Sequence, residues 1–334
     1  MVRLHSSCEL IDENGYYKKI QDLQPGDFIM NANLVPIQIR DIRSLPNSYE
    51  CQEIRHENWY IPFYCDKETN LCTTISNTTP QSFQFNTISF KTASMVSKDD
   101  SLGSIINIYR EMFEDKPNIV YGYDEVKSVG ISYDLGVWLG LYLGFGNFSR
   151  ESNREIIFRF GPNQSICDRL KKLTYTLFSA ENTNLKVHIL ESNDIFTVHI
   201  LCDDIYELVT RLGTGITKSL PRPFLVRNTN YMLGLIDGLT DFDNQNQFMQ
   251  FFPVNREIAK LISIACSFTG IRFSNQSSVL TNSFLIHVNP NDQPPDDTFI
   301  GKVIESNSKT MDNFIELEFN DSDLIIVNNI IIKT

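Results

Sequence analysis

The sequence predicts a mixed α+β protein in which an all-β domain is interrupted by a duplicated α/β domain. Three observations support this fold class: short strands with turn signals near both ends of the 334-residue chain, two apolar helical segments in its middle, and the same order of elements after each of those segments. We expect the β domain to comprise residues 1–130 together with 296–334. The duplicated domain should then span 131–295, with repeats at 134–222 and 231–290.

Turn signals divide the N-terminal region into short strands. Asn14-Gly15 is typical of a β-hairpin, and Pro25-Gly26 marks a second turn. The first four strands are expected at residues 8–12, 16–20, 28–30 and 35–42. Further strands and loops are expected over 66–82, a short helix over 105–113, a turn-rich linker over 290–298, and strands over 314–319 and 324–332.

The internal repeat is visible in the order of elements and in the letters. Residues FRFGPNQSICDRLKKL of the first copy correspond to QFFPVNREIAKLI of the second, and FTVHI corresponds to FLIHV. The first copy predicts a helix at 134–146, a strand at 156–160, a helix at 165–178, strands at 185–190 and 195–201, and a short helix at 204–212. The second copy predicts a helix at 231–239, a strand at 247–252, a helix at 256–268, and strands at 271–275 and 283–288.

Two glycine pairs lie in the apolar helices. Gly140 and Gly144 are four residues apart, as are Gly234 and Gly238, so each pair lies on one helix face. Glycine within a helix is destabilising by about 0.5–1 kcal/mol relative to alanine, and a close approach of two backbones is a physical reason to keep it. The four glycines therefore predict that the two helices cross side by side at a pseudo-twofold axis.

Charge and cysteine usage limit the classes of function. The net charge is −12, yet residues 131–295 carry 14 basic and 15 acidic residues, so the acidity lies in the rest of the chain, with 15 basic and 26 acidic residues. A near-neutral middle domain disfavours strong phosphate binding, and a local basic stripe at Arg150, Arg154 and Arg159 stays unproven. The seven cysteines form no Cys-x-x-Cys pair and are expected to be buried thiols. The five histidines form no ligand-spaced pair in the sequence.

Several segments together resemble one protein family. Residues 231–237, YMLGLID, resemble the motif of the LAGLIDADG homing endonucleases, and residues 138–144, WLGLYLG, resemble its first copy. Asn14-Gly15 followed by KKIQDLQPGD resembles the opening hairpin of the intein (Hint) fold, residues 217–221, TKSLP, resemble the segment before the second motif, and residues 322–332 resemble the closing Hint strands. The likeness is to the branch of the yeast vacuolar-ATPase intein and the mating-type-switching endonuclease.

The resemblance implies a Hint-like β domain interrupted by a LAGLIDADG-type saddle domain. It also implies double-stranded DNA as partner, Mg²⁺ as cofactor and site-specific double-strand cleavage. In this family each motif helix ends in an acidic residue, and the two carboxylates hold the metal ions. The resemblance places these positions at Phe145 and Leu239, neither of which can bind Mg²⁺.

Three carboxylates and one lysine are the remaining candidates for chemistry. Asp237 and Asp241, with Asp243 beside them, could substitute as metal ligands on the second side, or could be solvated or helix-capping groups. Lys218 resembles a family lysine that assists charge development at the scissile phosphate. The alternative for Lys218 is an ordinary surface lysine.

The residues for protein splicing are missing by the same resemblance. Splicing needs a Cys or Ser as first residue, a Thr-x-x-His and a terminal His-Asn. Here Met1 stands first, residues 74–77 or alternatively 78–81 lack the histidine, and residues 332–334 read IKT. Cys8 is expected in the core of the β domain. We therefore expect splicing to be lost.

Three functions stay open. The first is a degenerate, free-standing homing endonuclease with impaired cleavage; the second is a non-enzymatic DNA- or protein-binding descendant; the third is an active nuclease with a metal site rebuilt around Asp237, Asp241 and Asp243. We expect a monomer with internal pseudo-twofold symmetry. Because the sequence shows no signal peptide and no apolar run of about 18 residues, we expect an intracellular protein, nuclear or cytoplasmic, that is neither secreted nor membrane-bound.

Overall fold

The computed structural model describes the chain with short gaps. The residues left out of the description are 33–34, 57–58, 75–87, 99, 104–112, 123–124, 149–153, 180–183, 241–248, 252–254, 276–285, 290–299, 321–323 and 329. The described residues form a mixed α+β structure. They divide into two compact units, here unit 1 (Met1–Met112, Gly270–His287 and Asp292–Thr334) and unit 2 (Phe113–Thr269 and Val288–Asn291).

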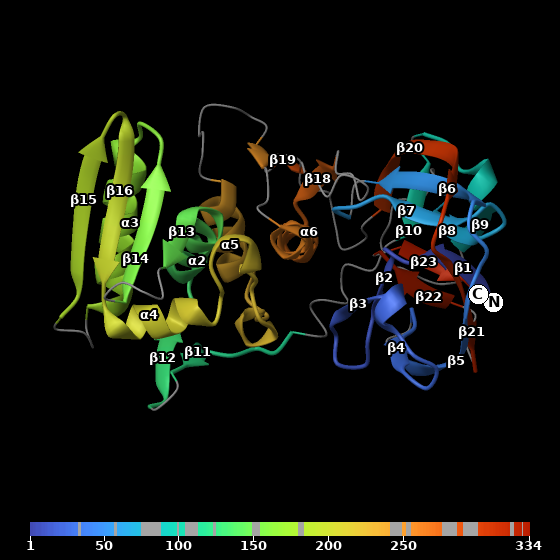
Figure 1. The fold of residues 1–334 in the computed structure, drawn as a ribbon, viewed down its shortest axis with the longest axis horizontal. Coiled ribbons are helices and arrows are strands. Elements are labelled where there is room, and N and C mark those ends of the chain that lie inside the picture. Colours follow the sequence, from blue (N-terminus) through green and yellow to red (C-terminus); the bar gives the residue numbers. More distant parts are fainter. Residues whose placement is uncertain are drawn as a thin grey trace. The chain divides into compact units, whose positions relative to one another are not determined.

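Unit 1 is built on one sheet, which in the described residues has 14 strands (Figure 1). The strand order is β3-β2-β22-β23-β8-β10-β20-β6-β7-β1-β21-β5-β4, and β9 pairs with β8. The strands are β1 Val2–His5, β2 Glu9–Ile11, β3 Tyr17–Lys19, β4 Phe28–Met30, β5 Pro36–Ser44, β6 Tyr49–His56, β7 Phe63–Asp66, β8 Asn70–Thr74, β9 Ile88–Thr92, β10 Ser101–Gly103, β20 Ile300–Met311, β21 Phe314–Phe319, β22 Leu324–Val327 and β23 Ile330–Lys333. Short 3₁₀ turns occur at Ile20–Asp22 and Ala93–Met95.

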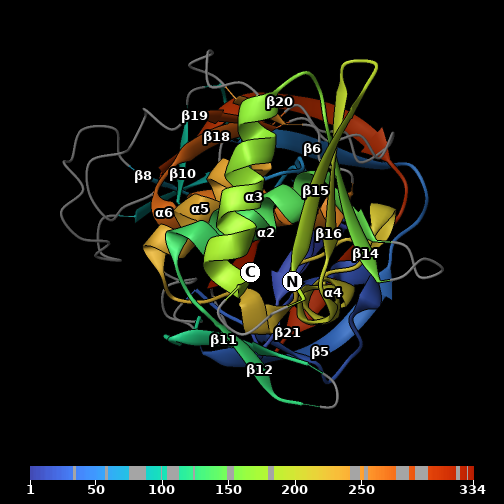
Figure 2. The same cartoon turned by 90° about the vertical axis from the view of Figure 1, so that its left-hand side faces the viewer.

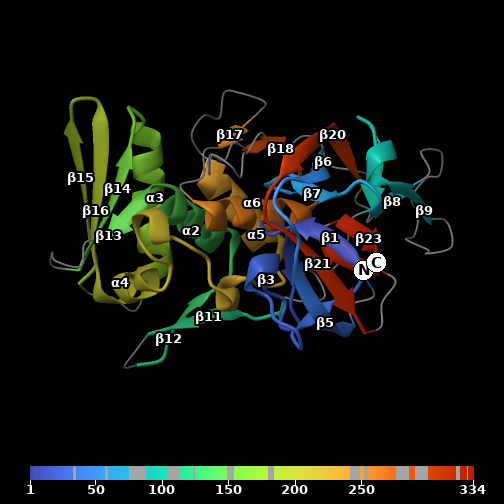
Figure 3. The ribbon, with the colours of Figure 1, turned by 45° about the vertical axis from the view of Figure 1, so that its right-hand side comes forward.

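Strands from the two ends of the sequence alternate within this sheet. β1 lies between β7 and β21 (Figure 3), with Val2 opposite Leu317, and β2 pairs with β22, with Leu10 opposite Val327. All these pairs are antiparallel. The side chains of Leu4, Leu10 and Leu317 are fully buried, so this core is assembled from both ends of the sequence.

Several strand predictions for this unit are confirmed, and others differ. The hairpin at Asn14-Gly15 joins β2 to β3, and Gly15 has the positive φ of 83° that favours glycine. The expected strand at 324–332 is instead two strands joined at Asn328, whose φ is 47°. The long pair β6–β20 was not predicted, because its residues are largely polar and show no apolar alternation. The expected helix at 105–113 lies outside the described residues except at Phe113.

Unit 2 contains the two apolar helices. Its elements are β11 Asn118–Tyr121, β12 Lys127–Gly130, α2 Tyr133–Phe145, β13 Gly146–Phe148, β14 Glu155–Phe160, α3 Gln164–Phe178, β15 Lys186–Ser192, β16 Ile195–Leu201, α4 Asp203–Thr210, α5 Thr229–Thr240, β17 Met249–Phe251 and α6 Arg256–Thr269, with 3₁₀ turns at Gly215–Thr217 (η4) and Arg222–Phe224 (η5). Strands β18 (Arg272–Asn275) and β19 (Ile286–Asn289) follow α6 in the sequence.

The first repeat forms an antiparallel sheet with helices on one face. Its strand order is β13-β14-β16-β15, and helix α3 runs alongside it (Figure 2). Phe158, Val198 and Ile200 point to the covered face and are fully buried. Because alternate residues of a strand point to opposite faces, the residues between them form the other face. No helix of the described residues is long and apolar enough to cross a membrane.

Helix α2 begins and packs as its sequence predicts. The Ser132 hydroxyl caps its first turn by accepting a hydrogen bond from the backbone N–H of Leu135 at 3.2 Å. Every residue from Leu135 to Leu143 is buried, which explains why the segment is apolar on all sides. The Trp138 indole N–H donates a hydrogen bond of 2.9 Å to the hydroxyl of Thr174 on α3, which joins the two helices.

Candidate functional site: the glycine-packed helix pair

Helices α2 and α5 touch through their backbones. A Cβ atom at any of four of their glycines would clash with the backbone of the other helix. The nearest atom would be the carbonyl oxygen of Tyr231 at 2.2 Å for Gly136, of Leu235 at 2.5 Å for Gly140, of Tyr133 at 2.2 Å for Gly234, and of Val137 at 2.2 Å for Gly238. Residue numbers rise together along both helices, so the helices run parallel.

The glycines of the two helices meet in a register that sequence inspection did not reveal. A Cβ on Gly140 would lie 2.9 Å from the carbonyl carbon of Gly238, and a Cβ on Gly136 would lie 3.1 Å from that of Gly234. Gly144 is different, because its nearest atom, the oxygen of Leu239, would be 3.9 Å away in ordinary contact. The close contact is therefore made by Gly136 and Gly140 of α2, one helical turn earlier than the pair Gly140 and Gly144.

This register decides which side chains occupy equivalent positions in the two helices. The residue that follows the second contact glycine is Leu141 in α2 and Leu239 in α5, and both are fully buried. Phe145 lies one turn further along α2, half-buried, with its ring centroid 5.6 Å from that of Phe160. The two equivalent positions thus hold leucines, which offer no donor atom to Mg²⁺.

Asp237 makes a hydrogen bond between the two helices. Its carboxylate accepts from the hydroxyl of Tyr133, which begins α2, and the pair is exposed. The partial burial of Tyr133, which is 37% exposed, and then its hydrogen bond to Asp237 raise its pKa to about 12. Asp241 and Asp243, the other two carboxylates considered as metal ligands, lie outside the described residues.

Lys218 is buried rather than exposed. Its side chain is 2% exposed, which excludes the surface-lysine alternative, and its ammonium lies 5.5 Å from the ring centroid of Tyr142 on α2. Burial lowers the pKa of Lys218 to about 8. The surroundings are tied together by hydrogen bonds: the Tyr142 hydroxyl donates to the carbonyl of Gly213 at 2.6 Å, and the Asn255 amide donates to the carbonyl of Lys218 at 2.8 Å.

The helix pair therefore combines a rigid frame with an apolar centre. In the described part of the chain, no group of three or more His, Cys, Asp or Glu side chains is placed to hold a metal ion. The residues at the two equivalent positions do not fit a divalent cation, so no step of a metal-assisted reaction can be derived from them. The arrangement does place a buried cation, Lys218, beside α2.

The structure describes two of the three arginines considered as a basic stripe. Arg154 precedes β14 with a positive φ of 55° and pairs with Asp203 at 3.1 Å, whereas Arg159 is exposed on β14 itself. Arg150 lies outside the described residues.

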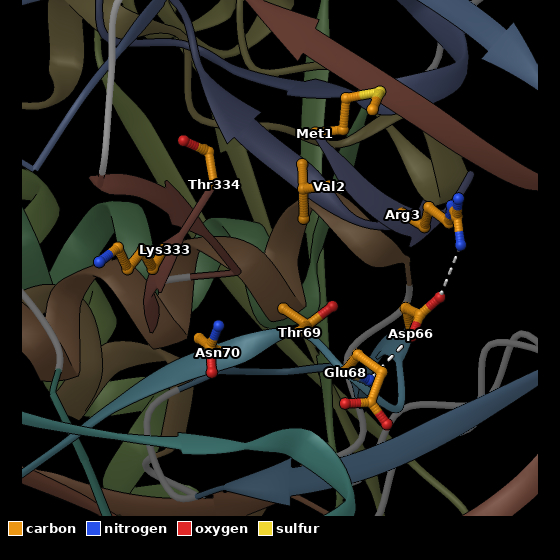
Figure 4. Close-up of a pocket in the computed structure, with 9 residues that line it drawn as sticks. All are labelled: Met1, Val2, Arg3, Asp66, Glu68, Thr69, Asn70, Lys333 and Thr334. Atoms are coloured by element: carbon orange, nitrogen blue, oxygen red, sulfur yellow. Dashed lines mark hydrogen bonds and ion pairs between the residues drawn. The ribbon is translucent and has the colours of Figure 1, made fainter.

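Unit 1 has a pocket of about 600 Å³ where the ends of β1, β8 and β23 meet (Figure 4). Its lining comprises Met1, Val2, Arg3, Asp66, Glu68, Thr69, Asn70, Lys333 and Thr334. The Arg3 guanidinium is already paired, with Glu316 at 2.7 Å and with Asp66 at 3.4 Å. This charge pairing leaves the pocket without a concentrated positive centre from Arg3.

The cysteines match the expectation of buried thiols. All seven are free and buried. Cys8 lies between β1 and β2, with its thiol 3.4 Å from the carbonyl oxygen of Tyr64, which is a core environment. Of the two segments considered for a Thr-x-x-His motif, only Thr74 lies in the described residues.

Comparisons with known proteins give partial likenesses only. No protein-family model and no curated protein matches the sequence. Among solved structures, the homing endonuclease I-DmoI in complex with DNA and calcium is 17% identical, covering 49% of this chain and 86% of that chain with a TM-score of 0.39. I-DmoI in complex with DNA and manganese is 15% identical, covering 49% and 93% with a TM-score of 0.37. The MchDnaB-1 intein is 16% identical, covering 29% and 64% with a TM-score of 0.23.

Proposed function

We propose that this chain is a degenerate relative of the LAGLIDADG homing endonucleases that has lost DNA cleavage and protein splicing. One observation supports it above all: the two parallel helices keep their glycine contact, while the position after the second contact glycine holds Leu141 and Leu239. The sequence resemblance placed the metal-binding carboxylates of the family at Phe145 and Leu239; aligned instead on the contact glycines, the motifs place them at Leu141 and Leu239. The packing of the two helices is retained, whereas the side chains that would bind Mg²⁺ have been lost.

The proposal gives each part of the chain a role. Residues 1–130 with 296–334 correspond to a Hint-like β domain, and 131–295 to a saddle-type domain that acts as a monomer with internal pseudo-twofold symmetry and double-stranded DNA as its partner. Lys218 is assigned to the former catalytic machinery. Its burial beside Tyr142, close to Leu141 in the sequence of α2, supports that assignment.

Restoring the carboxylates tests the proposal. The unmodified protein and the double variant Leu141→Asp with Leu239→Asp would be incubated with a randomised duplex library in Mg²⁺, and new strand ends would be mapped by sequencing. We expect no cleavage by the unmodified protein and nicking by the double variant. The matched control is Phe145→Asp with Leu239→Asp, which places one carboxylate about 6 Å further along the helix and should stay inactive.

Two further measurements make the result decisive. Because a carboxylate in a buried position is destabilising, circular dichroism must show that the double variant is folded. Lys218→Ala in the restored background should reduce nicking. If the unmodified protein cuts both strands of a defined site in Mg²⁺, the proposed loss of cleavage is wrong.

A non-enzymatic binding role is the second candidate. It is favoured by the open face of the first-repeat sheet, where Leu190 is 57% exposed and Ile195 is 49% exposed. Fluorescence anisotropy of labelled duplex at low salt separates the two forms of this candidate. Salt-dependent binding would support a DNA-binding descendant, and no binding by any variant would favour a protein-binding one.

A further inference from the structure

Two histidines occupy the open face of the first-repeat sheet, away from the helix pair. On β16 the buried residues Val198 and Ile200 point to the helices, so His199 between them points to the other face. On β15 the same alternation around the buried Val187 places His188 on that face, where it is exposed. Neither histidine takes part in the packing of the core.

The strand register brings these two histidines together. β15 and β16 are antiparallel, and His188 is directly opposite His199. Cβ atoms of directly opposite residues in such a pair are about 4.5–5.5 Å apart. Two imidazoles at that spacing can converge on one metal ion with metal–nitrogen distances of about 2.0–2.1 Å. They are eleven positions apart in the sequence, a spacing that does not by itself indicate a metal site.

A carboxylate on the neighbouring strand orients one of the rings. His199 Nδ1 lies 2.7 Å from Oε1 of Glu155 on β14. Because a carboxylate accepts hydrogen bonds, this contact places the ring proton on Nδ1 and leaves the Nε2 lone pair available. Metal-binding histidines are commonly held in this way by a carboxylate on their other nitrogen.

We propose that His188 and His199 form a surface site for a transition-metal ion such as Zn²⁺, with Glu155 as a positioning residue. The described residues supply two ligands, since no group of three or more His, Cys, Asp or Glu is placed to hold a metal. Two protein ligands leave coordination positions for water or for a donor atom of a bound partner. Imidazole ligands favour Zn²⁺, Cu²⁺ and Ni²⁺ over Mg²⁺, which prefers oxygen. The site is independent of the proposed nuclease ancestry.

Calorimetric titration with Zn²⁺ tests the site in the full chain without an affinity tag. Unmodified protein should bind one equivalent at this face, and His188→Ala and His199→Ala should each lower its affinity at least about tenfold. Glu155→Gln should lower it by about 10- to 100-fold. Thr197→Ala is the matched control, because Thr197 shares the strand and face of His199 but has no imidazole.

A second measurement identifies the ligands. With one equivalent of Cu²⁺, electron paramagnetic resonance should show coupling to two nitrogens in the unmodified protein and to fewer in His188→Ala. All four altered side chains are at least partly exposed, so melting temperatures should show that each variant is folded. Equal Zn²⁺ affinity in the unmodified protein and in both histidine variants would refute the site. Unchanged affinity in Glu155→Gln, with loss in the histidine variants, would refute the positioning role.

Discussion

Replacing Gly140 by alanine tests the backbone contact between α2 and α5. The added methyl carbon would lie 2.5 Å from the oxygen of Leu235, 2.8 Å from the nitrogen of Leu239 and 2.9 Å from the carbonyl carbon of Gly238. All three are backbone atoms of a helix, so none can rotate away as a flexible side chain would. The helices must separate by several tenths of an ångström along the contact.

The expected cost follows from two opposing effects. Overpacking a close-packed interior costs about 1–3 kcal/mol, whereas alanine gains about 0.5–1 kcal/mol over glycine within a helix. Because the clash is with backbone, we expect the larger effect to prevail, with a net loss of about 1–2 kcal/mol. For a domain of 150–250 residues, each kcal/mol shifts the melting temperature by about 2–4 °C.

Gly144→Ala is the control within the same helix. Its Cβ would be 3.9 Å from the nearest atom, the oxygen of Leu239, so only the helix-propensity gain should act. Differential scanning calorimetry should therefore show a lower melting temperature for Gly140→Ala and an equal or higher one for Gly144→Ala. The same melting temperature for both variants would refute the proposed register of the helix pair.

Three more predictions concern polar side chains of unit 2. Lys218→Met should stabilise the protein at pH 7. Because burial lowers the pKa of Lys218 from 10.5 to about 8, the buried ammonium lowers the free energy of unfolding by about 3 kcal/mol below pH 8, and this effect disappears as pH rises towards 10.5. Urea denaturation should therefore show that the stability gained by the variant shrinks over that pH range. Thr174→Val removes the acceptor of the Trp138 indole N–H and should cost about 1–3 kcal/mol in the same assay, with Thr174→Ser near the unmodified value. Asp237→Asn should lower the pKa of Tyr133 part of the way from about 12 towards 10, which NMR titration of the ring would follow. An unchanged pKa would show that the hydrogen bond to Asp237 does not contribute to the shift.

Elements whose burial is uniform could be predicted from the sequence. The apolar segment 134–146 became α2, Tyr133–Phe145, and the alternating segments 195–201 and 314–319 became β16 and β21 with the expected bounds. In each of these elements either one face or every face packs against the core, so the spacing of its hydrophobic residues predicts whether it is a helix or a strand.

Features that depend on register between elements could not be predicted. Gly136, Gly140 and Gly144 are spaced by four residues, so two alignments of the helix pair one turn apart fit the sequence equally well. Backbone distances choose the earlier one, in which Leu141 rather than Phe145 corresponds to Leu239. The pairing of His188 with His199 could not be predicted for the same reason, because it depends on the register between two strands.

The alternation of early and late strands in the sheet of unit 1 has a consequence for biosynthesis. β1 and β2 cannot acquire their partners β21 and β22 until more than three hundred residues have left the ribosome. The backbone contact between α2 and α5 involves no residue beyond 240, so it can form sooner. Long-range pairing of this kind slows folding, and at the bacterial-to-eukaryotic range of about 5–20 residues per second the first strands would wait for tens of seconds. During that interval their edges and apolar faces are exposed, so the nascent chain should depend on chaperones more than its finished form does.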